Sequence, residues 1–418
     1  MEKTIRSIKT PIRSCVRIPG SKSITNRALI LASLAQGTSE LHSILLSDDT
    51  RACIEALKNL GVEITLTDDA SVCTVVGHTK PFPRQEATIF CHHAGTVARF
   101  LLPVCAAAKG KYQFNASPQL SRRPLAHLLD VLAAQGAIIS SKSWPLLLQS
   151  NGLAGGEITI DATETSQFFS GLLMAAPFAK TNMILKTNRN AHYSYVNMTR
   201  HLMRAFGVEV DMLDSRRCHV PLPQCYSARQ YTIEPDFSTA SYFFAAAAVT
   251  QGEVTVPLLS RKQSIQGDVA FLDVLEKMGC EISEKNNGVS VQGPPILQGI
   301  DVNMRFYSDT FMTLAAIAPF ANSPTTIRNI GHTRHQESDR IAVMCHELNR
   351  LQVKVEEGDD WLRIYPSMPQ AGEVDSHDDH RIAMAFALIG LRISGVVISG
   401  AECVAKTCPD FFKLWDEF

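Results

Sequence analysis

Basic side chains stand at the starts of apolar segments in this chain. Lys22, Arg99 and Arg381 each precede or open a segment rich in alanine, leucine and phenylalanine, and Arg27 follows shortly after Lys22. The first turn of a helix presents unbonded N–H groups and a partial positive charge, so such starts favour anions. More polar helix starts carry further cations: Arg122, Arg123, Arg340 and Lys406. Capping by Ser, Thr or Asp explains the polar residue at any single start but not these cations. We therefore predict a convergent anion-binding cleft.

The sequence disfavours other kinds of site. A formal net charge of −1 gives no overall positive field of the kind that attracts nucleic acid. The residues around Gly20–Ser23 lack the GxxxxGK pattern of a P-loop, and no GxGxxG follows a predicted strand. The 11 cysteines lack zinc-site spacing. We expect no metal, no cofactor and no nucleic-acid partner.

The composition is typical of a globular protein with enough apolar material for two cores, at 45% hydrophobic and 19% charged residues. The first residues, MEKTIRSIKTPIRS, contain no apolar run that could serve as a signal or a membrane span. Scattered cysteines without a pairing pattern fit a reducing compartment. We expect a cytoplasmic protein with no membrane partner.

Five segments share a pattern in which an amphipathic helix ends at a glycine and a short strand follows. They read LKNLGVEI (57–64), LAAQGAII (132–139), MRAFGVEV (203–210), LEKMGCEI (275–282) and LNRLQVKV (348–355). Their near-constant spacing of about seventy residues indicates an internal repeat. The glycine predicts a left-handed helix end. Gln352 replaces it in the fifth segment, so that helix would need another way to end.

A second series of helices recurs at the same period, and its members are apolar on nearly all sides. They begin near Ser23, Gly95, Ser166, Thr239, Asp309 and His380. A helix without a polar face belongs inside a domain. The sequence thus predicts six units, each with a buried helix, an outer helix and several strands, in an α/β fold.

The six units divide most simply into two lobes of three. We place the boundaries at residues 20–235 for one lobe and at residues 1–19 plus 236–418 for the other, with the ligand cleft between them. The sixth outer helix, PDFFKLWDEF, ends at Phe418 and leaves no room for a following strand. A strand at about Cys15–Ile18 is expected to replace it.

Nine segments, in order along nearly the whole chain, resemble the 5-enolpyruvylshikimate-3-phosphate synthase family of enolpyruvyl transferases. They are IPGSKSITNRALILASLA (18–35), SDDTRACIEAL (47–57), AGTVARFLLP (94–103), SRRPLAHLLDVL (121–132), TSQFFSGLLMAAP (165–177), SDTFMTLA (308–315), QESDRIAVM (336–344), DDHRIAMAFAL (378–388) and AKTCPDFF (405–412). The resemblance implies two similar domains, each of three βαβαββ units with buried parallel helices, which close over the substrates.

The resemblance also implies the reaction. The enolpyruvyl group of phosphoenolpyruvate would pass to the 5-hydroxyl of shikimate-3-phosphate with release of phosphate, on the shikimate pathway towards chorismate and the aromatic amino acids. The partners would be these two small molecules, and the protein would act as a monomer without a cofactor. Such a reaction needs anion clamps, a base for the hydroxyl and an acid for the enol carbon.

Carried over residue by residue, the resemblance assigns catalytic roles to Asp309 as the base, Glu337 as a proton-transfer carboxylate and Lys22 at both substrates. The shikimate-3-phosphate site would comprise Lys22, Ser23, Arg27, Thr165, Ser166, Gln167, Tyr195, Asp309 and Gln336. The phosphoenolpyruvate site would comprise Lys22, Gly95, Arg123, Gln167, Arg340, Arg381 and Lys406. Gly95 is the small residue that leaves room for glyphosate in sensitive members.

Four positions depart from the usual family pattern. His93 stands where Asn commonly precedes AGT, His332 where the family often has a substrate-contacting Asn, and Gln336 where many members have Lys. His192 occupies the place of a family Ser. Gln336 keeps hydrogen bonding but lacks the positive charge, so these positions bear on substrate affinity.

Three alternatives stay open at this point. A sister transferase acts on UDP-N-acetylglucosamine through a loop cysteine, but the corresponding stretch 117–123 has none. The acceptor could be another phosphorylated or sugar-like alcohol. A non-catalytic paralogue that binds an anionic metabolite is a third possibility, although a pure binder would need neither Asp309 nor Glu337.

Overall fold

The computed structural model describes residues 1–68, 71–78, 81–161, 165–187, 193–285 and 288–418. The chain folds into two compact lobes. The N-terminal lobe is Gly20–Ile233, and the C-terminal lobe is Met1–Pro19 together with Glu234–Phe418. The second crossing between lobes thus falls between Ile233 and Glu234, two residues before the boundary that the sequence suggested.

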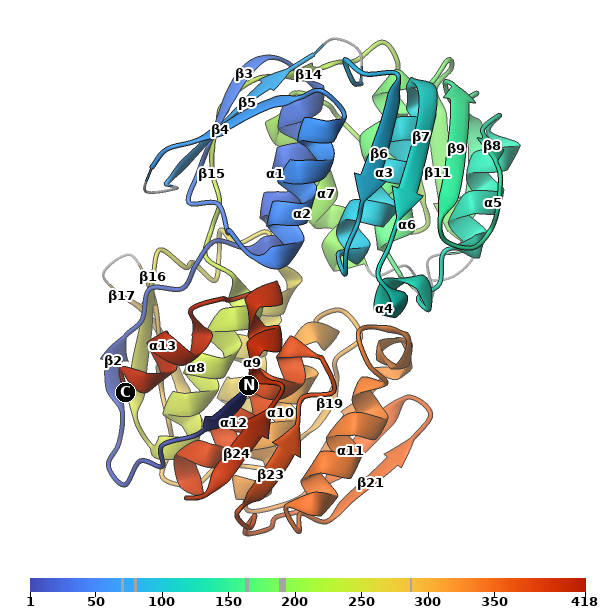
Figure 1. Cartoon of the computed structure of the whole chain (residues 1–418). Coiled ribbons are helices and arrows are strands. Elements are labelled where there is room, and N and C mark those ends of the chain that lie inside the picture. Colours follow the sequence, from blue (N-terminus) through green and yellow to red (C-terminus); the bar gives the residue numbers. More distant parts are fainter. Residues whose placement is uncertain (69–70, 79–80, 162–164, 188–192, 286–287) are drawn as a thin grey trace. The chain divides into compact units, whose positions relative to one another are not determined.

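Three helices form the interior of the N-terminal lobe: α1 (Lys22–Leu34), α3 (Gly95–Ala107) and α6 (Gln167–Ala175). Every residue of α3 is buried, and α1 is buried from Ile24 onwards. Figure 1 shows strands of the lobe running beside these helices. A helix enclosed on all sides needs no polar face, which explains the continuous apolar runs.

Three mixed sheets cover these helices. The first joins β14 (Tyr226–Ser227), β3 (Ala35–His42), β5 (Val72–Gly77) and β4 (Glu63–Leu66), and β15 (Gln230–Thr232) also pairs with β3. The second joins β6 (Glu86–Phe90), β7 (Lys109–Asn115), β9 (Leu146–Asn151) and β8 (Ile138–Ile139). The third joins β10 (Gly156–Ile160), β11 (Met183–Thr187), β13 (Arg217–Val220) and β12 (Asp211–Asp214).

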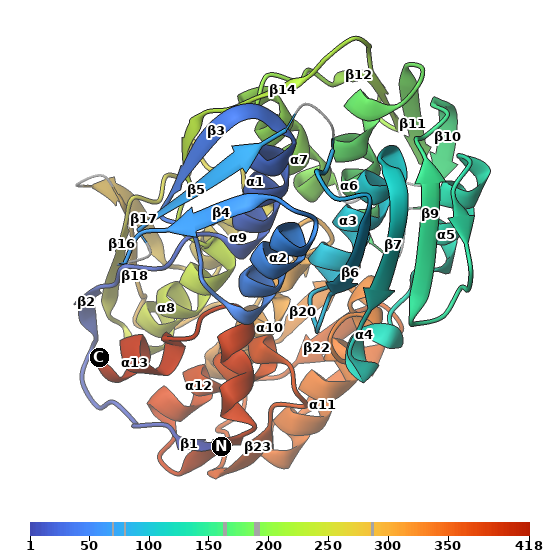
Figure 2. The same cartoon turned by 45° about the horizontal axis from the view of Figure 1, so that its top comes forward.

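The C-terminal lobe repeats this plan around α8 (Phe237–Thr250), α10 (Phe311–Ile317) and α12 (His380–Arg392). All residues of α8 and α10 are buried, and α12 is buried except at Arg392. Its strands are β16 (Glu253–Pro257), β17 (Glu281–Lys285), β18 (Gly288–Gln292), β19 (Asp301–Asn303), β20 (Thr325–Arg328), β21 (Val355–Gly358), β22 (Trp361–Ile364), β23 (Gly372–Asp375) and β24 (Val396–Ser399). Figure 2 shows the helices of this lobe with its sheets around them.

The N-terminal segment supplies two strands to the C-terminal lobe, and the sequence-based expectation for them was wrong. β1 (Glu2–Thr4) pairs antiparallel with β24 and completes the sixth sheet, β1-β24-β23. The strand β2 (Arg13–Cys15) instead lies parallel to β16 at the edge of the fourth sheet. The strand expected at about Cys15–Ile18 was therefore assigned to the wrong unit, because it belongs to the fourth unit and not to the sixth. The parallel position is the one that opens a βαβ unit, and β2 fills it for β16.

The outer helices are α2 (Asp48–Asn59), α5 (Ala126–Ala134), α7 (Tyr193–Ala205), α9 (Phe271–Lys277), α11 (Arg340–Arg350) and α13 (Phe411–Asp416). The glycines that follow four of them are left-handed, with φ of +92°, +99°, +89° and +99° at Gly61, Gly136, Gly207 and Gly279. Gln352 adopts the same conformation, with φ of 61°. The fifth outer helix, α11, therefore also ends at a left-handed residue, but this residue carries a side chain where the other four are glycines.

No helix in the part of the chain that the structure describes is long and apolar enough to cross a membrane.

The conformation of Gln352 makes a stability prediction. A left-handed residue with a Cβ is strained by roughly 1–2 kcal/mol, whereas glycine loses about 0.5–1 kcal/mol through unfolded-state entropy. Gln352→Gly should therefore raise the free energy of unfolding by up to about 1 kcal/mol in denaturant titrations. Gly136→Ala is the matched control, because no atom lies within 4 Å of the added Cβ, and it should lower stability. A destabilised Gln352→Gly would show that side-chain contacts outweigh the strain.

Candidate active site

Arg340 opens α11, and its guanidinium is enclosed, with 2% of the side chain exposed. Nε donates to Oδ2 of Asp379 at 2.8 Å, and Nη2 donates to Oε2 of Glu337 at 2.8 Å. Nη1 donates to Oδ1 of Asp309 at 3.3 Å and also to Oε1 of Gln336. Burial, the largest influence, lowers the pKa of Arg340, but the carboxylates of Asp379, Glu337 and Asp309 outweigh it and raise the pKa above its usual value.

Asp309 lies in the 3-10 turn Ser308–Thr310 that leads into α10. Its second carboxylate oxygen, Oδ2, accepts a hydrogen bond from Nη2 of Arg381 at 2.7 Å, and its carbonyl accepts one from Nη1 at 3.4 Å. Two guanidiniums therefore fix the carboxylate in one orientation. With 19% of the side chain exposed, Asp309 remains reachable by a ligand. A carboxylate in this position can accept a proton from a bound hydroxyl.

Glu337 is a second carboxylate held by two cations. Its Oε2 accepts from Arg340, and its Oε1 lies 3.5 Å from Nζ of Lys406. Lys406 ends the 3-10 segment Ala401–Lys406, and the side chains of Glu337 and Lys406 are each 9% exposed. Arg340 thus bridges the two carboxylates, Asp309 and Glu337, that the sequence proposed for proton transfer.

Two residues that depart from the family pattern lie in the same network. Gln336 binds Arg340 through its side-chain oxygen, a contact that an ammonium group could not make, because Lys has no acceptor. His332, in the 3-10 segment Gly331–His335, lies with Nε2 at 2.8 Å from Oγ of Ser308, the residue before Asp309. Both replacements are therefore neighbours of the carboxylate network.

Asp268 belongs to this network although the sequence did not point to it. It lies in the 3-10 turn Gly267–Ala270, is 4% exposed, and accepts a hydrogen bond from Oγ of Ser238 at 2.9 Å. Burial, with repulsion from Asp309, raises the pKa of Asp268 to about 7, against the attraction of Arg381. The only sequence signal was an acidic residue before an outer helix, which is usually a solvated side chain.

In the N-terminal lobe, α1 carries Lys22 and Arg27. Nζ of Lys22 lies 3.3 Å from Oδ2 of Asp49, which is itself 5% exposed at the side chain. Nε of Arg27 donates to Oγ1 of Thr199 at 2.8 Å, and its guanidinium lies 4.7 Å from the centre of the Phe100 ring. Burial lowers the pKa of Arg27 to about 10. Arg27 therefore carries its charge among neutral partners within the described part of this lobe.

Side-chain bonds join the starts of the three interior helices. Nδ2 of Asn26 on α1 donates to Oγ1 of Thr96 on α3 at 2.8 Å. Nη1 of Arg99 on α3 donates to Oε1 of Gln167 at the start of α6, also at 2.8 Å. Thr199 then links α7 to α6, because its Oγ1 lies at hydrogen-bonding distance, 2.9 Å, from Oγ of Ser170. The three helix N-termini, and the sequence-predicted residues on them, are therefore fixed relative to one another.

Gly95 begins α3 beneath two guanidinium groups. A Cβ at this position would lie 2.9 Å from Nη1 of Arg123 and 3.0 Å from Nη1 of Arg99. The absence of a side chain is what lets Arg123 approach the helix start. His93, two residues earlier, lies with Nδ1 at 3.1 Å from Oε1 of Gln119. It therefore takes part in the local structure beside Gly95.

The remaining sequence-predicted residues of this lobe also lie at helix starts. Thr165 accepts from the backbone N–H of Gln167 through Oγ1 at 3.2 Å, and Ser166 is the buried N-cap of α6. Ser23 is half-buried in the first turn of α1. Tyr195 is half-buried on α7, and its carbonyl accepts from Thr199. His192 lies outside the described residues.

The predicted site residues therefore form two groups, each within one lobe. The C-terminal lobe brings together Asp309, Gln336, Glu337, Arg340, Arg381 and Lys406 by direct contacts. The N-terminal lobe carries Lys22, Ser23, Arg27, Gly95, Arg123, Thr165, Ser166, Gln167 and Tyr195 on or beside α1, α3, α6 and α7. Within the described ranges, no three His, Cys, Asp or Glu side chains form a group able to hold a metal ion.

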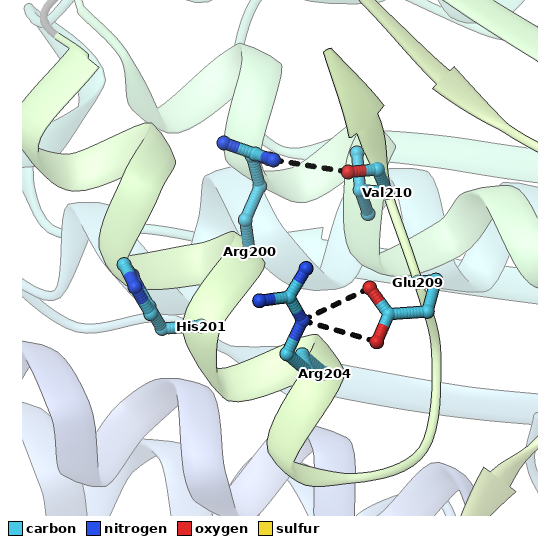
Figure 3. A pocket seen from close by; sticks show the side chains of 5 residues that line it. All are labelled: Arg200, His201, Arg204, Glu209 and Val210. Atoms are coloured by element: carbon cyan, nitrogen blue, oxygen red, sulfur yellow. Dashed lines mark hydrogen bonds and ion pairs between the residues drawn. The ribbon is translucent and has the colours of Figure 1, made fainter.

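A pocket on the later part of α7 is lined by none of the residues in these two groups. Figure 3 shows its side chains. The pocket is lined by Arg200, His201, Arg204, Glu209 and Val210. Nη2 of Arg200 donates to the carbonyl of Val210 at 3.0 Å, and Nε of Arg204 donates to both carboxylate oxygens of Glu209. These contacts tie the end of the helix to the segment that follows it.

The raised pKa of Asp268 predicts a pH-dependent stability. Its folded pKa of about 7 exceeds the ordinary value of 3.8, so its contribution is retained at low pH and is lost as the pH rises through about 7. Asp268→Asn should therefore gain stability relative to the unmutated chain between pH 5 and pH 8, by on the order of a few degrees in melting temperature.

Asp301→Asn is the control for this measurement. Asp301 is exposed, and its hydrogen bond from Arg328 lowers its pKa, so its titration lies below the tested range. The melting-temperature difference for Asp301→Asn should stay flat from pH 5 to pH 8. A flat difference for Asp268→Asn as well would mean that Asp268 is already ionised throughout.

Comparison with known proteins places these groups in a family. Residues 7–415 match the family model of EPSP synthase (3-phosphoshikimate 1-carboxyvinyltransferase). A 3-phosphoshikimate 1-carboxyvinyltransferase of Nostoc punctiforme is 44% identical over 413 residues, covering 98% of this chain and 97% of the relative. One of Sulfurovum sp. is 42% identical over 410 residues, covering 96% of this chain and 95% of the relative.

The fold comparison agrees. A solved structure of an EPSP synthase from Acinetobacter baumannii superposes with a TM-score of 0.85, covering 100% of this chain and 98% of that one at 24% identity. This likeness confirms the two-lobe α/β fold with three repeats in each lobe. Because the family model and the curated relatives span nearly the whole chain, the protein belongs to the EPSP synthase family.

Proposed function

We propose that this protein transfers the enolpyruvyl group of phosphoenolpyruvate to the 5-hydroxyl of shikimate-3-phosphate and releases phosphate. Family membership supports the reaction. The observation that carries the assignment of roles is the placement of two carboxylates, Asp309 and Glu337, on one buried guanidinium, that of Arg340. A binding protein for the same anions would need the cations but not this pair of carboxylates.

The chemistry needs two proton transfers in the addition half of the reaction and one at carbon in the elimination half. In the addition, the 5-hydroxyl oxygen attacks C2 of phosphoenolpyruvate, its proton passes to a base, and the CH₂ carbon gains a proton. In the elimination, that carbon loses a proton while the C–O bond to phosphate breaks. We assign the base at the hydroxyl to Asp309 and proton transfer at the carbon to Glu337, with Lys22 stabilising the negative charge that develops.

Shikimate-3-phosphate is assigned to the N-terminal lobe, at the starts of α1 and α6. Lys22, Ser23 and Arg27 lie on the first of these helices, and Thr165, Ser166 and Gln167 lie at the start of the second. Helix N-termini and hydroxyl donors suit a phosphate. Tyr195 on α7 would complete this group, while Asp309 and Gln336 would contact the acceptor from the C-terminal lobe.

Phosphoenolpyruvate is assigned to the cations Arg340, Arg381 and Lys406, with Lys22, Gly95, Arg123 and Gln167 from the N-terminal lobe. Arg340 already donates to Asp379, Glu337, Asp309 and Gln336, which engages all its nitrogens. A substrate carboxylate therefore has to displace an acceptor. The neutral oxygen of Gln336 is the easiest to displace, because no ion pair is broken.

Since the two groups of residues belong to different lobes, we further propose that the substrates draw the lobes together. Neither lobe alone carries both Lys22 and Asp309, so only the doubly liganded protein would assemble the full set. We also propose that the protein works as a monomer in the cytoplasm, without metal or cofactor.

The assay is phosphate release with both substrates, and with each substrate omitted in turn. The proposal expects stoichiometric phosphate and an enolpyruvyl ether only when both are present, at an undiminished rate in excess EDTA. UDP-N-acetylglucosamine and unphosphorylated shikimate test the alternative acceptors. Binding of both substrates without turnover would favour the non-catalytic alternative.

Asp309→Asn tests the base directly. The amide keeps the shape of the side chain and removes the proton acceptor, so turnover should fall by roughly 10²-fold or more. Equilibrium affinity for shikimate-3-phosphate should change little. The exposed Asp301→Asn is the matched control in the same lobe and should leave turnover unchanged. Near-normal turnover in Asp309→Asn would remove Asp309 from the mechanism.

A further inference from the structure

Glu347 is a fully enclosed carboxylate in the middle of α11, with 0% of its side chain exposed. Oε1 lies 3.0 Å from Nε2 of His377, and Oε2 accepts from Nη1 of Arg350 at 3.0 Å. Oε2 also accepts from the backbone N–H of Asp375 at 3.3 Å, and His346 lies at 3.7 Å from Oε1. Burying a carboxylate is unfavourable unless it is fully partnered, and here three cationic or ionisable neighbours and a backbone donor surround it.

These contacts hold an unusual turn. The strand β23 ends at Asp375, and the next residues include two consecutive left-handed ones, His377 with φ of 51° and Asp378 with φ of 55°. Each such residue with a Cβ is strained by roughly 1–2 kcal/mol. A turn of this kind persists only when its surroundings hold it, and Glu347 contacts both its entrance at Asp375 and its first left-handed residue.

The turn leads directly into the carboxylate network. The next residue, Asp379, accepts from the backbone N–H of Arg381 at 3.0 Å and so caps α12. It also accepts from Nε of Arg340 at 2.8 Å and from Oγ of Ser338 at 3.0 Å. The conformation of residues 377–378 therefore decides where Asp379 lies, and with it the start of the helix that carries Arg381.

Helix α11 therefore binds residues 375–379 at two points. Arg340 binds Asp379, while Glu347, two turns further along the same face, binds Asp375 and His377. At a rise of about 1.5 Å per residue the two anchor points are roughly 10 Å apart along the helix. The strained residues lie between the anchors, so loss of either one would let the turn relax.

We propose that Glu347 is a positioning residue for the phosphoenolpyruvate side of the reaction. It touches no substrate; it acts through the 375–379 turn, which sets Asp379, and through Asp379 it sets Arg340 and Arg381. This inference rests on the proposed function. It predicts that weakening the Glu347 anchor impairs phosphoenolpyruvate binding more than shikimate-3-phosphate binding, because the latter is assigned mainly to the other lobe.

The first experiment measures both KM values, kcat and the melting temperature for Glu347→Gln. The substitution replaces one carboxylate oxygen, which accepts hydrogen bonds, by an NH₂ group, which donates them. Because the neighbouring groups also donate, their hydrogen bonds to that oxygen would be lost. Because a displacement of about 1 Å can lower catalysis 10²-fold, KM for phosphoenolpyruvate should rise by roughly 10-fold or more, and KM for shikimate-3-phosphate should change much less. The control is Glu373→Gln, which changes an exposed glutamate in the middle of β23 and should alter neither KM.

A rescue variant separates positioning from general stability. Asp378→Gly relieves strain at a left-handed position that glycine adopts freely. Added to Glu347→Gln, it should restore most of the lost phosphoenolpyruvate affinity. His377→Asn is a second, milder weakening of the same anchor, since Asn tolerates left-handed backbone but is too short for the histidine contact. It tests the proposal even where Glu347→Gln does not fold.

The outcomes are distinguishable. Absence of turnover in the unmutated protein overturns the proposed function. In that case the variants are still compared by their equilibrium affinities for phosphoenolpyruvate. The positioning role is overturned if the unmutated protein turns over and Glu347→Gln leaves the KM for phosphoenolpyruvate unchanged. Where Glu347→Gln does not fold, the same result in His377→Asn overturns it. A fall in melting temperature with both KM values unchanged would assign Glu347 to stability alone.

Discussion

Arg340 is a permanent charge placed almost entirely out of water, and this placement constrains the C-terminal lobe. A buried guanidinium is tolerated only when carboxylates compensate it and its N–H groups are bonded. Asp379, Glu337 and Asp309 supply that compensation. Two of these three are the groups assigned to proton transfer. The same ion pairs that make the buried charge tolerable therefore also orient the carboxylates assigned to proton transfer, before any substrate arrives.

The interior helices of the N-terminal lobe begin differently from those of the C-terminal lobe. The N-cap residues of α1 and α3, Ser21 and Ala94, make no side-chain cap, whereas Asp236 and Asp379 cap α8 and α12 in the C-terminal lobe. Of the third interior helix in each lobe, α6 has its first N–H bonded by Thr165, and α10 has no side-chain cap from Thr310. An acidic cap satisfies the helix start internally, and an uncapped start is open to an external anion. This difference fits the assignment of the substrate phosphate to the N-terminal lobe and of the proton-transfer carboxylates to the other.

Much of the fold followed from local signals. The seventy-residue period, the left-handed glycines and the wholly apolar helices each report on residues close in sequence, and they predicted the repeats and interior helices correctly. The strand at Glu2–Thr4 was missed because its partner, β24, lies at the other end of the chain. Gln352 was expected to end its helix differently, but it adopts the left-handed backbone of the four glycines, with φ of 61°.

Residues of the candidate site could be predicted from the sequence where they belong to a recognisable motif, and not elsewhere. Motif residues such as Arg340 and Lys406 could be placed by resemblance, although their partners could not. Asp268 and Glu347 carry no motif, and a single acidic residue just before or on an outer helix ordinarily faces solvent. Only the packed structure shows that both are enclosed, one beside Asp309 and the other beneath the turn that leads to Asp379.

Arg340 is held in place by carboxylates before substrate binds. The arginine Nε–Hε correlation spectrum of the ligand-free protein, with Arg340 assigned through Arg340→Lys, tests this most directly. We expect a distinct, slowly exchanging Hε signal for Arg340 near neutral pH, because Nε donates to the buried Asp379. The signal should persist, little changed, when phosphoenolpyruvate is added. A signal that is lost to solvent exchange in the free protein and emerges only with ligand would show that the carboxylates do not hold Arg340 before substrate binds.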